Sequence, residues 1–226
     1  GSGVAFDNMG QARGAMGIDA GQFRNDETMG IVIGNFANEM TALFVSMNQP
    51  LQFFDAAIAT GLGPPTRLEL TFGVFFFDYD LDGRLDVLSA NGHLEEEIHT
   101  VQESQTYAQP AQLFWNGGLD RECEFVRVPV EKCGPDLVRP IVGRGSAFAD
   151  LDGDGDLDVL ITCSGGAPRL LRNDQQLGRH WIRFLLQGTQ CNRDAIGARI
   201  EVHAGPRVLT RPVMPTRSYL SQSELA

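Results

Sequence analysis

The segment "FADLDGDGDLDVLIT" (residues 148–162) carries five aspartates within residues 150–158. Neighbouring carboxylates repel one another by about 1 kcal/mol per pair even at the dielectric of water, so a bound cation is the simplest reason to gather them. Their spacing, D-x-D-x-D-G-x-x-D, is that of an oxygen cage for a hard cation such as Ca²⁺, which takes about six to eight oxygen ligands. The expected ligands are Asp150, Asp152, Asp154 and Asp158, with the backbone carbonyl of Asp156 at the seventh position.

A second copy of this loop lies in "FFDYDLDGRLDVLSAN", residues 76–91. Its seventh position is Arg84 where the other copy has Asp156, so opposite charges occupy the position at which only main-chain oxygen is expected to bind. An EF-hand is excluded because position 12, where that motif needs a bidentate Glu, is Ser89 or Ile161. The sequence therefore predicts two Ca²⁺ sites. The ligands expected in this copy are Asp78, Asp80, Asp82, the carbonyl of Arg84, and Asp86.

Short β-rich runs flank both loops, so each loop is expected to join two strands. A third, degenerate copy lies upstream in "GQFRNDETMGIVIGNF", where only Asp26 keeps a ligand position, and we expect no ion there. Each copy is followed by a strand-like segment that ends in Asn48, Asn116 or Asn173. These repeats predict an all-β fold with four-stranded β-propeller blades. Because a propeller needs about 4–8 blades to close, residues 1–177, with about three blades, are expected to be an incomplete propeller fragment.

From residue 178 onward the apolar residues alternate as they do in strands. The alternation is seen in "WIRFLLQ" (181–187), "ARIEVHAG" (198–205) and "RVLTRPV" (207–213), and it predicts a small β-domain over residues 178–226, truncated at its C-terminus. Residues 1–177 hold 11 basic and 26 acidic side chains, a net −15, whereas residues 178–226 hold 7 and 3, a net +4. We therefore expect this Arg-bearing tail to dock on its acidic neighbour.

The composition limits the classes of partner. A chain of 226 residues that is 42% hydrophobic and 21% charged can bury a sizeable core. No apolar run approaches the ~20 residues of a membrane-spanning helix, and the net charge of −11 argues against nucleic acid. The chain begins Gly-Ser-Gly without a visible signal peptide, and we expect both ends to be cut from a longer polypeptide. Cys123 and Cys133 could bridge a hairpin in an oxidising compartment or remain free thiols.

The sequence shows no catalytic constellation. His93 and His99 bracket three glutamates in an insertion over residues 91–112, but H-x5-H matches no metalloprotease pattern. We expect both histidines to be exposed loop residues, with a short helix over residues 95–100. No serine lies in a nucleophile elbow, and no phosphate-binding loop occurs. Trp115 and Phe75–Phe77 are expected in the strand core rather than on a sugar-stacking platform.

At this point the motifs resemble known families. The loops at residues 76–93 and 148–162 resemble FG-GAP/VCBS repeats of integrin-like propellers. The tail is similar to the ASPIC/UnbV domain that ends proteins of the cartilage acidic protein family, through Asn-Arg-Asp-x-Ile-Gly-Ala at 192–198 and Tyr-Leu-Ser-Gln-Ser at 219–223. The resemblance implies a secreted or cell-surface β-propeller with Ca²⁺ in its inter-strand loops and a role in extracellular binding.

Together these features predict a non-enzymatic, calcium-stabilised module, extracellular or periplasmic, that recognises a protein or glycan ligand. An ion that binds only the folded loops stabilises them, and sub-micromolar cytosolic Ca²⁺ would not. One alternative is part of a Ca²⁺-dependent polysaccharide lyase or hydrolase, marked by a convergent Arg/Lys, Tyr and carboxylate cluster such as Tyr107 with His93. Another is a structural role in a surface assembly, with the basic tail as the docking element.

Overall fold

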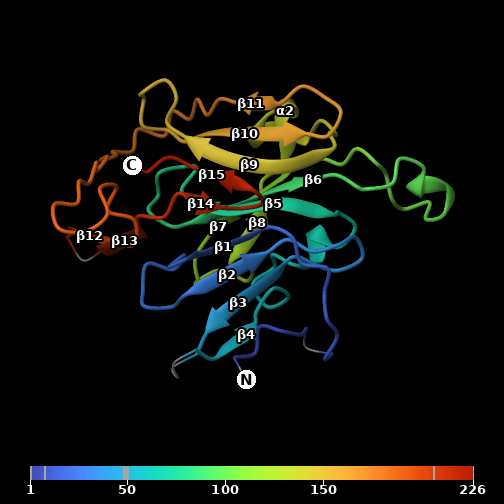
Figure 1. The fold of residues 1–226 in the computed structure, drawn as a ribbon, viewed down its shortest axis with the longest axis horizontal. Coiled ribbons are helices and arrows are strands. Elements are labelled where there is room, and N and C mark those ends of the chain that lie inside the picture. Colours follow the sequence, from blue (N-terminus) through green and yellow to red (C-terminus); the bar gives the residue numbers. More distant parts are fainter. Residues whose placement is uncertain (1, 8, 48–50, 206, 226) are drawn as a thin grey trace.

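Antiparallel strands form nearly all the regular structure in the computed structural model, which describes residues 2–7, 9–47, 51–205 and 207–225 (Figure 1). The prediction of an all-β fold is confirmed. The helical segments are short: η1 (Pro64–Thr66), η2 (Ile98–Thr100), α1 (Val130–Cys133) and α2 (Pro135–Val138). Within the described ranges, no helix has the length and apolar character needed to cross a membrane.

Three sheets follow one another along the chain, and we call them the first, second and third units. The first unit comprises β1 (Ile18–Gly21), β2 (Gly30–Ile33), β3 (Ala42–Ser46) and β4 (Phe53–Asp55), hydrogen-bonded in that order. The second comprises β5 (Thr71–Phe77), β6 (Asp86–Asn91), β7 (Gln112–Asn116) and β8 (Phe125–Arg127), again in order. The third comprises β9 (Gly143–Ala149), β10 (Asp158–Cys163) and β11 (Arg169–Leu171).

The first hairpin has the same register in every unit. The residues that pair at the ends of its loop are Gly21 with Gly30, Phe77 with Asp86, and Ala149 with Asp158. The connecting segments are therefore equal in length, and we call them the first loop (22–29), the second loop (78–85) and the third loop (150–157). This match supports the prediction that the segment beginning at residue 22 is a degenerate copy of the two acidic loops.

The second unit is packed on both faces. Side chains alternate across a strand, so Phe76 of β5 joins Phe23 in a core shared with the first unit, while Phe75 and Phe77 join a core shared with the third unit. The rings of Phe23 and Phe76 stack with centroids 5.7 Å apart. Burial on both faces explains why β5 is buried at every position and carries no charged side chain. The core prediction is confirmed for the phenylalanines, and Trp115 is partly buried against the second of these cores.

The tail forms two small hairpins, β12 (Arg199–Ala204) with β13 (Arg207–Pro212), and β14 (Thr216–Arg217) with β15 (Ser221–Gln222). The strands predicted within 198–205 and 207–213 are therefore confirmed. The strand predicted over 181–187 is wrong, because that described segment has no strand pairing, and Leu185 in its middle is 80% exposed. Alternation is a property of one chain, whereas a strand also needs a neighbour for its backbone hydrogen bonds.

The β14–β15 turn contacts the first strands of all three units. The backbone N–H of Ser218 donates to the Ile18 carbonyl at 3.0 Å. The Ser218 hydroxyl accepts from the Val74 N–H at 3.0 Å and lies 2.9 Å from the Ser146 hydroxyl. Tyr219 follows directly and packs edge-on against a ring of β5. The tail is thereby hydrogen-bonded to the repeats at the place where their first strands lie side by side.

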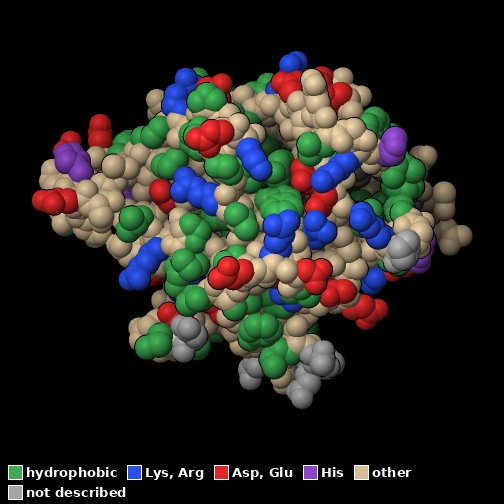
Figure 2. Space-filling model, turned by 180° about the vertical axis from the view of Figure 1, so that it is seen from behind, with side chains coloured by type: hydrophobic (Ala, Val, Ile, Leu, Met, Phe, Trp, Pro, Cys, Tyr) green, Lys and Arg blue, Asp and Glu red, His purple; other side chains and the backbone are tan. Residues whose placement is uncertain are grey.

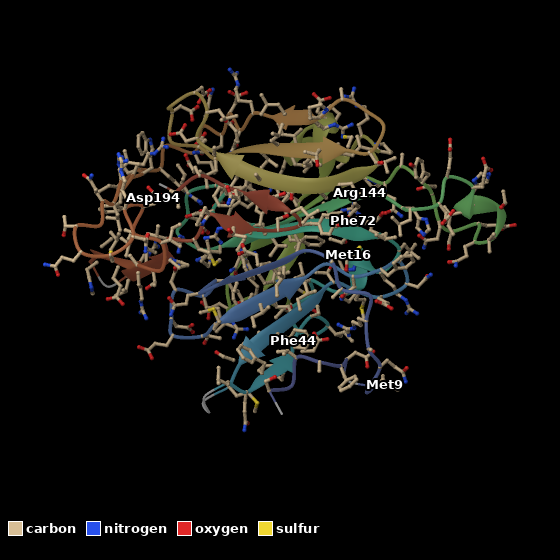
Figure 3. The ribbon with its side chains drawn as sticks, viewed as in Figure 1. Met9, Met16, Phe44, Phe72, Arg144 and Asp194 are labelled. Atoms are coloured by element: carbon tan, nitrogen blue, oxygen red, sulfur yellow. The ribbon has the colours of Figure 1, made fainter. Side chains whose placement is uncertain are left out.

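His93 is buried, so the expectation that it is an exposed loop residue is wrong. Its ring packs edge-on against Phe36 with centroids 5.7 Å apart, and the backbone carbonyl of His93 accepts a hydrogen bond from Arg144 at 3.0 Å. The Arg144 guanidinium also lies 4.3 Å from the centre of the Phe72 ring (Figure 3). These contacts come from distant parts of the chain. His99 is exposed as expected, and only η2 forms in the helix expected over 95–100.

Cys123 and Cys133 do not flank a hairpin. After β8 the chain turns at Pro129, which fits the N-terminus of a helix because it has no N–H to satisfy, and continues into α1. Both cysteines are free thiols, as are Cys163 and Cys191. Of the three asparagines expected to end the third strands, Asn116 ends β7, Asn173 lies two residues after β11, and Asn48 lies outside the described residues.

Candidate metal centres

The three loops share backbone conformation as well as length. The fifth residue of each loop accepts a hydrogen bond from the N–H two positions further on. These residues are Asp26 at 2.7 Å, Asp82 at 2.8 Å and Asp154 at 3.0 Å. The fourth residue of each has positive φ: Asn25 at 55°, Leu81 at 57° and Gly153 at 81°. A leucine is unfavourable in that conformation, so the geometry of the loop, rather than local preference, imposes the turn.

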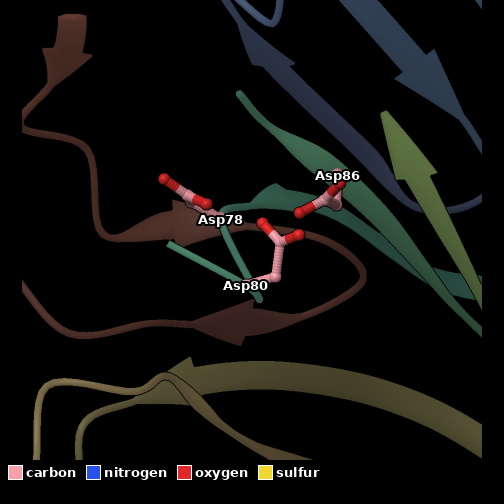
Figure 4. A group of neighbouring side chains, drawn as sticks. All are labelled: Asp78, Asp80 and Asp86. Atoms are coloured by element: carbon pink, nitrogen blue, oxygen red, sulfur yellow. The ribbon is translucent and has the colours of Figure 1, made fainter. Parts of the chain in front are cut away.

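Three carboxylates gather at the second loop (Figure 4). Asp78, Asp80 and Asp86 each place an oxygen within 4.8 Å of the others, and we call them the second-loop triad. Burial raises the pKa of Asp78 to about 6, although Arg211 opposes the shift, and burial also raises the pKa values of Asp80 and Asp86. The loop thus holds like charges where water solvates them poorly. A bound cation would stabilise their ionised forms.

Asp86 also fastens the second loop to the neighbouring strand. Its Oδ1 accepts from the Asn116 N–H at 2.7 Å, and its Oδ2 accepts from the Tyr79 N–H at 3.1 Å. Asp158 makes the equivalent two bonds in the third unit, at 2.9 and 3.1 Å. Because each carboxylate oxygen has a second lone pair, these backbone bonds leave Asp86 able to ligate an ion.

A second group of carboxylates, the third-loop triad, comprises Asp150, Asp152 and Asp154, whose oxygens also lie within 4.8 Å of one another. Asp152 and Asp154 are exposed, so this triad is better solvated than the one in the second loop. The side chains of Asp156 and Asp158 lie outside the triad. The Asp156 side chain accepts a hydrogen bond from Gln175 at 2.7 Å, and ligation through the Asp156 main-chain carbonyl stays a prediction.

Asp82 is the expected ligand of the second loop that lies outside its triad. One of its oxygens accepts from the Arg84 backbone N–H, and the other forms an ion pair with the Arg84 guanidinium. The Arg84 Nε donates to the Asn116 carbonyl at 2.8 Å. None of these contacts uses the Arg84 carbonyl, so ligation through that main-chain oxygen stays a prediction.

In the first loop the space that the Asp86 carboxylate occupies in the second loop is filled by the Phe23 ring. Gly30 stands at the position of Asp86, and a Cβ there would lie 2.5 Å from the fully buried ring of Phe23. Arg24, at an aspartate position, forms a two-pronged ion pair with Glu124 of the second unit, with both distances 2.8 Å. The absence of an ion from this loop stays a prediction, now with a structural reason.

The two triads suit a hard divalent cation. All their side-chain donors are carboxylate oxygens, which favour Ca²⁺ or Mg²⁺ over ions that prefer nitrogen or sulfur. Ca²⁺ binds oxygen at about 2.3–2.6 Å, so two oxygens on one ion lie no more than about 5.2 Å apart. The separations of up to 4.8 Å in both triads satisfy that limit.

Arginines of the tail contact the acidic part of the chain, as the charge division of the sequence predicts. On one face of the molecule basic and acidic side chains are interspersed (Figure 2). Charge counting identifies the attraction but not the partners, because these lie far apart in sequence. The pairs are Arg179–Asp80 at 2.7 Å, Arg183–Asp150 at 3.7 Å, Arg211–Asp78 at 3.6 Å and Arg217–Asp19 at 2.9 Å.

Comparison with known proteins identifies the tail. A family model described as ASPIC and UnbV matches residues 188–226. The match confirms the resemblance of the tail to that domain and begins ten residues after the boundary expected at residue 178. No curated protein matches the chain.

Proposed function

We propose that this chain is a calcium-stabilised module of an extracellular or periplasmic, cell-surface β-propeller, which recognises a protein or glycan ligand and has no catalytic role. The observation that carries the proposal is one loop geometry repeated in three successive sheets, with carboxylate triads in two of them. The resemblance of the acidic loops to FG-GAP/VCBS repeats, and of the arrangement to the cartilage acidic protein family, supports the same conclusion.

The units have properties that suit propeller blades. In the first two, four antiparallel strands are hydrogen-bonded in sequence order. The first strands of successive units, β1, β5 and β9, are neighbours in space. A propeller repeats such sheets around an axis with neighbouring blades packed face to face. The two shared cores of the second unit are consistent with that packing.

Calcium supplies the reason for an extracellular setting. With a Kd near ~10⁻⁴ M, typical of extracellular modules, and ~1 mM Ca²⁺, each site would stabilise the fold by about 1.4 kcal/mol. Two sites would raise Tm by roughly 6–11 °C in a chain of this size. At sub-micromolar cytosolic Ca²⁺ the contribution would vanish.

Thermal melts in Ca²⁺, in Mg²⁺ and in EDTA test this proposal. We expect Tm to rise by roughly 6–11 °C in ~1 mM Ca²⁺ and much less in Mg²⁺, which dehydrates reluctantly and demands octahedral geometry. The double variant Asp80→Asn/Asp154→Asn should lose most of the shift, since it removes one carboxylate from each triad. Asp120→Asn, an exposed aspartate outside both triads, is the control. An equal shift in the double variant would refute calcium binding at the triads.

The enzymatic alternative gains no specific support from the cluster that would mark it. The backbone N–H of His93 donates to the backbone carbonyl of Tyr107 at 2.8 Å, so these two residues meet through their main chains. However, the Arg144 guanidinium beside them donates to the carbonyls of Gly92, Gly143 and His93 at 2.7–3.0 Å. Its hydrogen bonds serve the fold.

A further inference from the structure

An open cavity of about 390 Å³ lies between the second loop, the third loop and the start of the tail. It combines one large aromatic side chain with several polar ones, whereas the phenylalanines of β5 lie in the core. The side chains that bear on recognition are Asp154, Asp156, Gln175, Gln176, Arg179 and Trp181.

Trp181 lies directly on the turn of the third loop. Gly155 has a φ of 94°, and a Cβ there would come within 2.0–2.2 Å of three indole atoms, so only glycine leaves room for the ring. Trp181 remains 48% exposed. The indole is thus supported by backbone on one side and open to solvent elsewhere. Such a ring offers a large, rigid apolar surface at the edge of a polar cavity.

The polar side chains around the ring are already oriented. Gln175 donates to Asp156 Oδ1 at 2.7 Å and accepts from the Leu177 N–H at 2.8 Å. Arg179 is held by both the carbonyl and the carboxylate of Asp80, each at 2.7 Å. These contacts fix planar groups before any ligand binds, which reduces the entropy lost on binding. The second oxygen of Asp156 and the exposed Gln176 amide provide further acceptors and donors.

We propose that this cavity binds a neutral sugar. A pyranose has apolar C–H groups that can pack on an indole, and neighbouring hydroxyls that pair with planar amide and carboxylate groups. A neutral ligand is favoured over an acidic one because Asp156, which lines the cavity outside the third-loop triad, keeps its negative charge when that triad holds an ion, while the charge of Arg179 is matched by Asp80. The volume is at the small end of the about 300–1,000 Å³ range of ligand sites, which suits one or two rings. This inference rests on the proposed function and names the ligand class.

The test is a titration of the whole chain with neutral disaccharides in the presence of Ca²⁺. Binding is measured by tryptophan fluorescence and by calorimetry. The probes are cellobiose, maltose, mannobiose and chitobiose, with a digalacturonic acid as the charged comparison. We expect at least one neutral disaccharide to saturate the chain and digalacturonic acid to bind at least tenfold more weakly. Trp181→Ala should weaken binding at least tenfold and Trp181→Phe less, while Gln176→Ala should weaken it about threefold.

The matched control is Leu185→Ala, on the same extended segment but outside the cavity, and it should bind as the parent chain does. The inference is overturned if no neutral disaccharide binds, if Trp181→Ala binds unchanged, or if the acidic disaccharide binds as well as the neutral ones. The Ca²⁺-induced rise in Tm is measured on every variant. If Tm still rises in Ca²⁺ while no sugar binds, only the sugar inference is refuted. If Ca²⁺ does not raise the Tm of the parent chain, the proposed calcium-stabilised module is refuted, whatever the sugar titration shows.

Discussion

Asn116 joins the first two units through side-chain hydrogen bonds. It is fully buried, and its amide donates to the carbonyls of Phe23 at 2.9 Å and Leu85 at 3.0 Å. Its side-chain oxygen accepts from the Gly118 N–H at 3.0 Å. Asn173, its counterpart in the third unit, reaches back to the Tyr79 carbonyl in the second loop at 2.7 Å. One asparagine therefore bridges each of the first two loops to the unit that follows it.

This role gives a graded prediction. Asn116→Ala should lower the free energy of unfolding by about 2–4 kcal/mol, because three hydrogen bonds are lost and two buried carbonyls are left unpaired. Asn173→Ala, which removes one partly buried side-chain bond, should lower it by about 1 kcal/mol. Chemical denaturation of both variants measures the difference. Equal losses of unfolding free energy in the two variants would contradict this prediction, because the hydrogen bonds of Asn116 and Asn173 would then contribute equally to stability.

The residues of the site could be predicted only in part. The spacing of the aspartates identifies the loops because the ligand register is local. The recurring asparagine was visible as a sign of repetition, but its bridging role depends on the unit that precedes it in space. The acidic partners of the tail arginines and the burial of His93 could not be predicted, because both depend on contacts between segments that lie far apart in the sequence.

Among the elements, β1 and β14 are joined by a buried ion pair. Arg217 Nη1 contacts both oxygens of Asp19, at 3.0 and 2.9 Å, and Asp19 also accepts from the Phe76 N–H at 2.8 Å. Burial raises the pKa of Asp19, and Arg217 opposes that shift. The Asp19 charge is thus accommodated in the interior mainly because an arginine from the tail lies beside it.

Removing that arginine should be costly. Arg217→Met should destabilise the fold by about 3–5 kcal/mol by leaving a buried carboxylate unpaired, and Asp19→Asn/Arg217→Met should recover part of the loss. Without Arg217 the folded-state pKa of Asp19 rises further above its unfolded value. Stability is then lost as pH rises through that window, so the deficit of the single variant should be smaller at pH 4 than at pH 7. Denaturation at both pH values checks the sign, and a constant deficit would contradict the mechanism.

Element prediction succeeded where pattern and pairing coincide. Alternation gave β12 and β13 because each supplies the other with backbone partners six pairs long. The same alternation over residues 181–187 gave no strand, since nothing in the described chain pairs with it. Pro129 similarly redirected the chain after β8 into a helix. The alternation of apolar residues shows which side chains can lie on one face of a strand. Whether the strand forms depends on a neighbouring segment that accepts and donates its backbone hydrogen bonds.

At the scale of the whole molecule, ion pairs hold the negatively charged repeats and the positively charged tail together, and these ion pairs differ in how exposed they are to solvent. Arg179 and Arg183 are partly exposed, whereas Arg217 faces a fully buried carboxylate. Salt screens exposed charges strongly and buried ones weakly. The two ends of the tail should therefore respond differently to ionic strength.

Limited digestion with trypsin at low and high NaCl measures this difference. Raising NaCl from about 0.05 to 0.5 M shortens the screening length to a few ångströms, so trypsin should cleave after Arg179 and Arg183 faster. Cleavage after Arg217, which the buried pair holds, should keep its rate. Equal acceleration at all three arginines would show that the tail docks as one salt-sensitive body.

The contacts of Ser218 and Arg217 also bear on how the chain acquires its structure. Arg217 meets Asp19 across 198 residues, and Ser218 meets Val74 across 144. Contacts of such long sequence separation form slowly, because a large loop must close before they contribute. During synthesis the first strand therefore leaves the ribosome long before its arginine partner exists. Until that partner arrives, the buried position of Asp19 is unfavourable, and the earliest unit is the last to become complete.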